Sequence, residues 1–225
     1  MIARFESEFD TFSGQLQGKL KRLFAAGIFD RETVNQAFAD AGYTDLVNAW
    51  VDNYAEVITF NKQLANELGI NFIITNDTIK NFELIQGMDF DKLQISQELY
   101  ATDMRKSALK YSLEGKSFKD VAFKTELEDI LGTFKRRASA EAYTGIGIAE
   151  STIKKDWFEK AGIEKFVYVG PNDNVTRDDC QATLNDPRQS TGWTMEDINS
   201  SQTPFISRGG WNCRHDWLPF VDDMP

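Results

Sequence analysis

The sequence predicts a mainly α protein, with a long helical N-terminal region followed by a small α+β C-terminal module. All five prolines lie at or beyond position 171, so the residues before them lack the side chain that most disrupts helices. Apolar residues in that stretch recur at spacings of three and four, as in helices with one buried face. Beyond about residue 163 the pattern changes to short β-type runs, turns and short capped helices.

A stripe of six apolar residues predicts the first helix. Gly27 is expected to end it, and Asp30 to cap a short second helix that ends near Gly42. We interpret the stripe as core rather than as a docking surface. Its members are Phe5, Phe9, Phe12, Leu16, Leu20 and Phe24.

Further helices are expected along the N-terminal region. Thr44 would cap a helix that buries Leu64 and Leu68 and ends at Gly69. A short helix over about 76–86 and a separate one around 93–111 would follow. Ser117 would cap the next segment, and 126–162 would form one long helix or a broken pair. Three glycines in it, Gly132, Gly145 and Gly147, would mark kinks or close helix packing.

The C-terminal segment predicts two short strands and two short helices. The first strand is expected over 165–169, followed by a turn and a helix that Thr176 caps and that runs to Leu184. Thr194 and Asp197 have the spacing of a capping box for a second short helix. An extended strand over 212–218 would place Cys213, His215 and Trp217 on one face.

Composition excludes some classes of protein. The net charge of −10 gives no global positive field, so we expect no nucleic acid binding through overall charge. We interpret the acidity chiefly as a source of solubility, with a basic protein surface as the alternative and a better candidate partner than DNA. The longest apolar runs are too short to span a membrane. The N-terminus carries acidic residues and does not resemble a secretory signal, so we expect mostly reduced thiols.

An ordered series of motifs follows residue 134. A helical stretch with Arg136, Arg137 and Glu141 leads to a β-type run, then to Asp173 and to the motif Thr-Arg-x-x-Cys over 176–180. The series closes with Gly-Gly-Trp-Asn-Cys-Arg-His over 209–215 and Pro219. Taken together, residues 134–220 resemble the C-terminal domain of phage head morphogenesis proteins, the Mu F-like minor head proteins.

This resemblance implies two regions and a structural role. Residues 1–133 would form the helical region, and 134–225 the Mu F-like module, with a long helix first and a compact α+β part from about 163. The resemblance implies a non-enzymatic minor head protein in the head or portal region of a tailed-bacteriophage virion, assembled in the host cytoplasm. The implied partners are portal and capsid or scaffold proteins, with self-association as an option. Some members carry a toxin or transferase domain after this module, and we expect none here because the sequence ends at Pro225.

Two positions depart from the family pattern. Many members have a Cys-x-x-Cys pair where this chain has Thr183, and many close with Cys-Arg-Cys where this chain has His215. The candidate metal ligands are therefore Cys180, Cys213 and His215, with Asp178, Asp179 or a water as the fourth. A disulfide and a pair of buried thiols beside His215 are the alternatives, and together we favour them, so no cofactor is expected unless zinc binds.

The arginines of the module predict ion pairs. Asp173, Asp178 and Asp216 are candidate partners for Arg177 and Arg214, with solvated charges as the alternative. We favour an ion pair for Arg214, because tryptophans flank it at 211 and 217. Catalysis is not expected, because the chain has a single histidine and shows no glycine-rich phosphate loop. The alternative functions are a small metal-binding or nucleolytic module with a helical adaptor, and an adaptor at the phage neck or tail.

Overall fold

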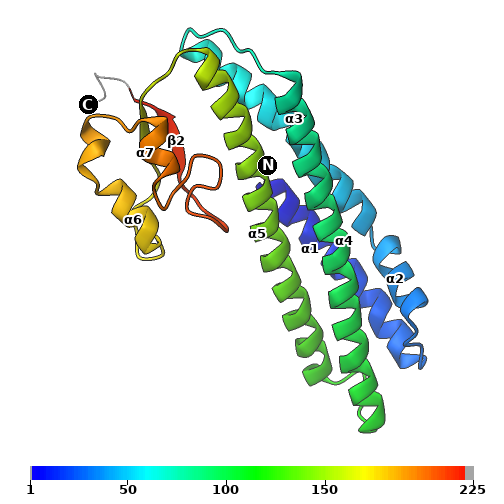
Figure 1. The fold of residues 1–225 in the computed structure, drawn as a ribbon. Helices are drawn as coiled ribbons and strands as arrows, with labels where there is room; N and C mark the ends of the chain where they lie inside the picture. Colours follow the sequence, from blue (N-terminus) through cyan, green and yellow to red (C-terminus); the bar gives the residue numbers. More distant parts are fainter. Residues whose placement is uncertain (1, 221–225) are drawn as a thin grey trace. The chain divides into compact units, whose positions relative to one another are not determined.

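The computed structural model describes residues 2–220, with side chains from residue 5 onward. Within this part the chain forms seven α-helices, one short 3-10 helix and two strands (Figure 1). The predicted class is confirmed: mainly α, with a small α+β part at the C-terminal end. Within residues 2–220 no helix is both long and apolar enough to cross a membrane. The elements are α1 (Ile2–Ala25), α2 (Arg31–Asp40), α3 (Tyr43–Glu67), α4 (Asn76–Leu113), α5 (Val121–Lys160), β1 (Phe166–Val169), α6 (Asp178–Leu184), η1 (Pro187–Ser190), α7 (Met195–Asn199) and β2 (Asp216–Pro219).

Contacts within the chain define two compact units, each formed by two stretches of sequence. Unit 1 comprises Met1–Asn53 and Met88–Ala142, and unit 2 comprises Tyr54–Gly87 and Tyr143–Pro225. The long helices α3, α4 and α5 each supply residues to both units. The boundary that the sequence suggested between 133 and 134 lies inside α5.

Unit 1 has an aromatic core. The six residues of the N-terminal stripe are all buried, at 2% exposure or less, so the interpretation of the stripe as core is confirmed. Phe134 of α5 lies at the centre, with its ring 5.1 Å from that of Phe9 and stacked 4.6 Å from that of Tyr100. Because Tyr100 belongs to α4, these rings fix α1 and α4 onto α5. Figure 1 shows α4 and α5 running side by side in opposite directions.

Several predicted helix ends are confirmed, and two predicted N-caps are wrong. Asp30 caps α2 as expected, and its Oδ1 accepts a hydrogen bond from the backbone N–H of Thr33 at 2.8 Å. Thr44 is not a cap, because α3 already begins at Tyr43. Ser117 accepts from the N–H of Lys119 within a turn, and α5 begins only at Val121.

The buried face of α3 also differs from the prediction near the end of the helix. Leu68 is 39% exposed, and the buried positions there are Asn61 and Ala65. The side chain of Asn61 donates to the carbonyl of Val57 at 2.9 Å and accepts from the indole N–H of Trp157 at 3.2 Å. A polar residue was therefore taken into the core because both of its hydrogen-bonding groups are satisfied there.

Glycines interrupt α4 and α5 less than the sequence suggested. The two helices expected over 76–86 and 93–111 are one helix, α4, and Gly87 lies within it. A glycine inside a helix costs only about 1 kcal/mol relative to alanine, which the packing of so long a helix can offset. Helix α5 is likewise unbroken, and Gly147 marks close packing as expected: a Cβ there would lie 1.5 Å from the guanidinium of Arg208.

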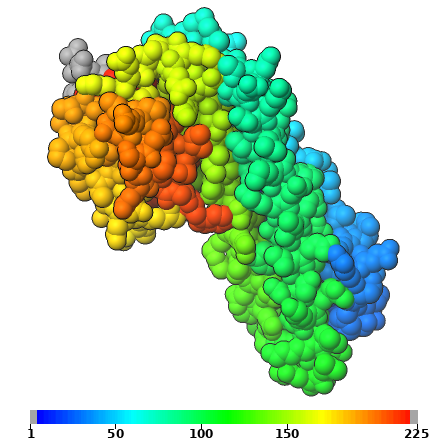
Figure 2. All heavy atoms as spheres, viewed as in Figure 1, coloured from blue at the N-terminus to red at the C-terminus, as the bar shows by residue number. Residues whose placement is uncertain are grey.

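In unit 2 the two strands pair antiparallel, with Tyr168 opposite Trp217 and Val169 opposite Asp216. The second strand is shorter than predicted, because Asn212 adopts a φ of 52° and the chain becomes extended only from Asp216. Figure 2 shows the orange and red atoms of this module lying against the yellow-green atoms of α5.

The N-cap predicted from the sequence is wrong for α6 and confirmed for α7. Arg177, not Thr176, occupies the N-cap position of α6, and Thr176 instead donates to the carbonyl of Pro171 at 2.9 Å. The capping box of α7 is present, with Thr194 accepting from the N–H of Asp197 at 3.2 Å and the Asp197 carboxylate accepting from the N–H of Thr194 at 3.0 Å.

We expect Thr194→Ala to destabilise the protein by about 1 kcal/mol, because it removes the hydroxyl that satisfies an N–H at the first turn of α7. Urea denaturation measures this change, and Thr194→Ser, which keeps the hydroxyl, is the matched control. Equal midpoints for the alanine and serine variants would contradict a role for the cap.

Candidate metal centre

Three buried side chains that carry metal-ligand atoms meet in unit 2. Cys180 comes from α6, while Cys213 and His215 come from the turn before β2. The two sulfurs are 4.0 Å apart, and the sulfur of Cys213 is 3.7 Å from Nδ1 of His215. The three ligand atoms all lie within 4.8 Å of one another. The sequence motif therefore identified residues that the fold does bring together, although not through the extended strand we expected.

The orientation of His215 is fixed by contacts on both sides of its ring. Its Nε2 lies 2.8 Å from the carbonyl oxygen of Pro171. A carbonyl only accepts, so Nε2 carries the proton and Nδ1 presents its lone pair toward the sulfur of Cys213. The ring of Tyr168 stacks on the imidazole, with centroids 5.3 Å apart and planes 14° apart. Burial lowers the pKa of His215 and keeps the ring neutral.

The sulfur of Cys213 receives several hydrogen bonds. The backbone N–H of Gly209 donates to it at 3.2 Å and that of His215 at 3.5 Å. The hydroxyl of Tyr168 lies 3.5 Å from both sulfurs. Burial alone would raise the pKa of Cys213, but the hydrogen bonds outweigh it and lower the pKa. Burial raises the pKa of Cys180 instead. The hydrogen bonds thus favour the charged form of Cys213, whereas burial disfavours that of Cys180 in the metal-free protein.

Gly209 is a site residue whose role the sequence did not reveal. A Cβ at this position would lie 2.2 Å from the sulfur of Cys180 and 3.0 Å from that of Cys213. Only a residue without a side chain leaves room for both sulfurs beside this turn. The signal in the sequence is the Gly209-Gly210 pair, which is typical of a turn but does not by itself indicate packing against sulfur.

We expect Gly209→Ala to destabilise the protein by about 1–3 kcal/mol, because the added methyl overlaps the sulfurs. The matched control is Gly132→Ala inside α5, where the nearest atom is an arginine nitrogen at 3.6 Å. That substitution should be neutral or stabilise by up to about 1 kcal/mol through helix propensity. Urea denaturation of both variants checks the opposite signs, and destabilisation of similar size in both would contradict the packing argument.

Two arginines hold the loops around the cluster. Arg214 binds the carboxylate of Asp173 through both terminal nitrogens, at 2.6 and 2.8 Å, so the predicted tie is confirmed. This bond holds the pKa of Asp173 well below its ordinary value. Arg177 binds backbone oxygens rather than a carboxylate. Its guanidinium donates to the carbonyls of Gly209, at 2.6 Å, and Trp211, because the tight turn presents its backbone oxygens to α6.

A hollow of about 270 Å³ opens onto the cluster. Its lining includes all three candidate ligands together with Thr176, Arg177 and Asn212. Neither Asp178 nor Asp179 belongs to the ligand group found among residues 2–220, so water is left from the candidates for a fourth ligand. Both cysteines are free in the structure.

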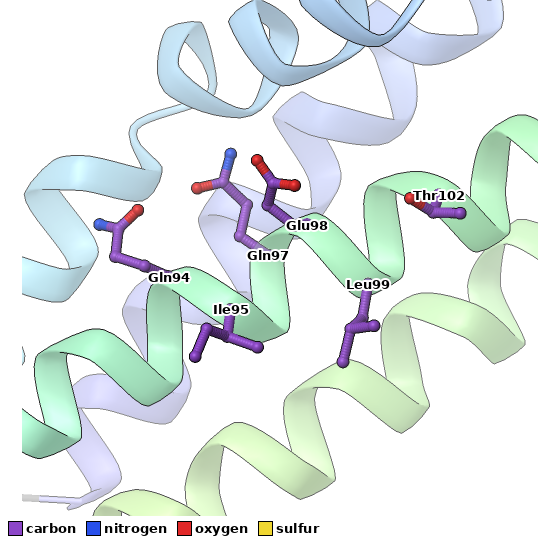
Figure 3. Close-up of a pocket in the computed structure, with 6 residues that line it drawn as sticks. All are labelled: Gln94, Ile95, Gln97, Glu98, Leu99 and Thr102. Atoms are coloured by element: carbon purple, nitrogen blue, oxygen red, sulfur yellow. The ribbon is translucent and has the colours of Figure 1, made fainter.

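A second hollow, of about 580 Å³, lies on the surface of α4 in unit 1 (Figure 3). All of its lining residues come from that one helix, and they include two glutamines, Ile95 and Leu99. The carboxylate of Glu98, which also lines this hollow, forms an ion pair with Arg31. These side chains bring together no nucleophile with a base and no group of metal ligands, so the cysteine–histidine cluster is the better candidate site.

Comparison of the chain with known protein families, with curated proteins and with solved structures found no match.

Proposed function

We propose that this chain is a structural minor head protein of a tailed bacteriophage, associated with the portal and acting in head morphogenesis. One observation carries the proposal: the two cysteine-containing motifs of the resemblance to Mu F-like proteins meet around one small volume of unit 2. Arg177 and Cys180 come from the first motif, and Cys213 and Arg214 come from the second. Residues far apart in a sequence are expected to converge in this way when they serve a single structural unit.

The contacts of these residues support a structural role. Arg177 binds backbone carbonyls of the last turn, and Arg214 forms its two-fold bond with Asp173. The imidazole of His215 is held on one side by the Pro171 carbonyl and on the other by the sulfur of Cys213. Groups that hold loops together in this way are not free to exchange protons with a substrate, which favours a non-enzymatic protein.

The charge of the chain bears on its partners. A net charge of −10 favours association with a basic protein surface and disfavours binding to nucleic acid through overall charge. Portal and capsid or scaffold proteins are the partners that the resemblance suggests. We therefore propose the portal region of the virion head as the location of this protein.

The test is to express the chain with a C-terminal tag from its own phage genome and to purify the assembled particles. We expect the chain in purified particles, and we expect it to capture the portal protein after mild disruption. Its copy number relative to the portal ring would define how it is attached. Absence of the chain from particles, together with recovery of neither portal nor capsid protein, would overturn the proposal.

The same particles discriminate the alternative functions. A neck or tail adaptor would remain with isolated tails rather than with tail-less heads. A nucleolytic module would cleave DNA in the presence of a divalent metal, and Cys213→Ser would remove that activity. Either result would contradict the proposed function and support the corresponding alternative.

A further inference from the structure

Two of the three distances between the ligand atoms are close to what a tetrahedral zinc ion needs, and the third, between the sulfur of Cys180 and Nδ1 of His215, is no more than 4.8 Å. Zinc binds thiolate sulfur at about 2.3 Å and imidazole nitrogen at about 2.0–2.1 Å, which places two sulfurs about 3.8 Å apart and a sulfur and a nitrogen about 3.5 Å apart. The structure has 4.0 Å between the sulfurs and 3.7 Å between the sulfur of Cys213 and Nδ1 of His215. A contraction of a few tenths of an ångström would therefore complete this part of the coordination sphere.

The groups that would orient the ligands and stabilise their charge are also in place. Histidines that bind metals usually donate their other ring N–H to a carbonyl or carboxylate, which fixes the tautomer and the ring orientation. Nε2 of His215 does this with the carbonyl of Pro171 at 2.8 Å. The backbone N–H groups of Gly209 and His215 point at the sulfur of Cys213 and would stabilise it as a thiolate. This arrangement goes beyond what the packing of two thiols requires.

The chemistry of the three candidate ligands favours zinc. Two thiolates and one neutral imidazole are soft to intermediate donors, and a tetrahedral site of this kind suits zinc. The two negative charges would balance the ion, so the buried cluster would be neutral overall. Binding would release the thiol protons to solvent without any redox step.

We propose that Cys180, Cys213 and Nδ1 of His215 bind one zinc ion, with a water molecule from the adjoining hollow in the fourth position. The ion would tie α6 to the turn that precedes β2. The module from about residue 163 is small and has only two short strands, so such a tie would add stability that its core cannot supply alone. This inference does not depend on the proposed phage function, because it concerns the isolated chain.

The test is to produce the full chain in a reducing host with zinc in the medium and to measure metal content after dialysis against metal-free buffer. The purification tag must contain no histidine, because tag histidines would bind zinc themselves and hide the contribution of His215, the chain's single histidine. We expect about one zinc per chain, and we expect Cys180→Ser, Cys213→Ser and His215→Gln each to weaken binding by at least about tenfold. Tyr168→Phe is the matched control: it removes the hydroxyl that lies 3.5 Å from both sulfurs but removes none of the three proposed ligands, so it should retain stoichiometric zinc.

A second measurement on the unmodified chain covers variants that fail to fold. Cobalt substituted for zinc should give a thiolate-to-metal charge-transfer band and the intense visible bands of a tetrahedral site. Removal of the zinc with a chelator should lower the melting temperature of the chain, and adding zinc back should restore it.

Three results would overturn the proposal. Refolding in excess zinc could leave the chain without bound metal, or cobalt could bind without thiolate bands. An intact chain isolated under reducing conditions could also be lighter by the two hydrogens that a disulfide loses. Loss of zinc in Tyr168→Phe would overturn the assignment of water as the fourth ligand.

Discussion

Replacing Lys154 with alanine is expected to destabilise unit 2 by about 3–5 kcal/mol, because it removes a buried cation shared by two partly buried carboxylates and leaves Asp216 only the more distant Arg208, at 3.9 Å. Lys154 is 1% exposed, and its ammonium group binds Glu150 at 2.6 Å as well as the carboxylate of Asp216. Both acids are largely shielded from water, with side chains 21% exposed. Asp216 is also the first residue of β2. Loss of Lys154 would therefore weaken the strand pairing beside the turn that carries Cys213 and His215.

The measurement is urea denaturation followed by tryptophan fluorescence. Four of the five tryptophans lie in unit 2, so the signal reports mainly on that unit. The matched control is Lys155→Ala, whose side chain is 34% exposed and 3.9 Å from Glu159. A surface pair of this kind should change stability by no more than about 0.5 kcal/mol. A small effect of Lys154→Ala, similar to that of the control, would show that the buried ion pairs do not hold unit 2 together.

Lys154→Met separates charge from volume. Methionine keeps most of the aliphatic stem but not the ammonium group, so we expect most of the loss seen in Lys154→Ala to remain. Adding Glu150→Gln to Lys154→Met removes one of the unpaired charges and should recover part of the stability. If the methionine variant were as stable as the natural chain, packing rather than charge would explain the role of Lys154.

The role of Lys154 could not be predicted from the sequence. A lysine in a helical pattern is ordinarily placed on the solvent face, and its partner Asp216 lies 62 positions away. The pair forms only after β2 has packed against the end of α5. By contrast, the ends of α1 and α2 were predictable because their signals, an apolar stripe and an N-cap aspartate, act within a few residues.

The candidate site shows the same division between local and distant information. The motifs identified Cys180, Cys213 and His215, but the strand expected over 212–218 begins only at Asp216, because Asn212 takes a positive φ. Nothing in the identity of Pro171 indicates that its carbonyl would orient the histidine, since every residue has a carbonyl. Backbone groups become part of a site only through the fold, so the groups that orient the candidate ligands could not have been inferred from residue types.

Replacing Phe134 with alanine is expected to destabilise unit 1 by about 3–5 kcal/mol, because it opens a cavity at the centre of the aromatic cluster. Phe134 is fully buried, and its ring contacts those of Phe9, Phe38, Tyr43 and Tyr100. These neighbours come from four different helices, so they cannot close over the lost volume without shifting helix positions. Phe134→Leu, which fills much of the space, should cost less than about 1.5 kcal/mol.

Hydrogen exchange is the appropriate measurement, because it assigns the loss of stability to individual helices. Protection should fall in α1 and in residues 121–142 of α5, whereas Leu99→Ala on the exposed side of α4 should change stability by no more than about 0.5 kcal/mol. Leu99 is 52% exposed, which makes it a matched apolar truncation outside the core. If Phe134→Ala left protection in α1 unchanged, the N-terminal stripe would not depend on this core. It would then be available to a partner, contrary to the burial of all six of its residues.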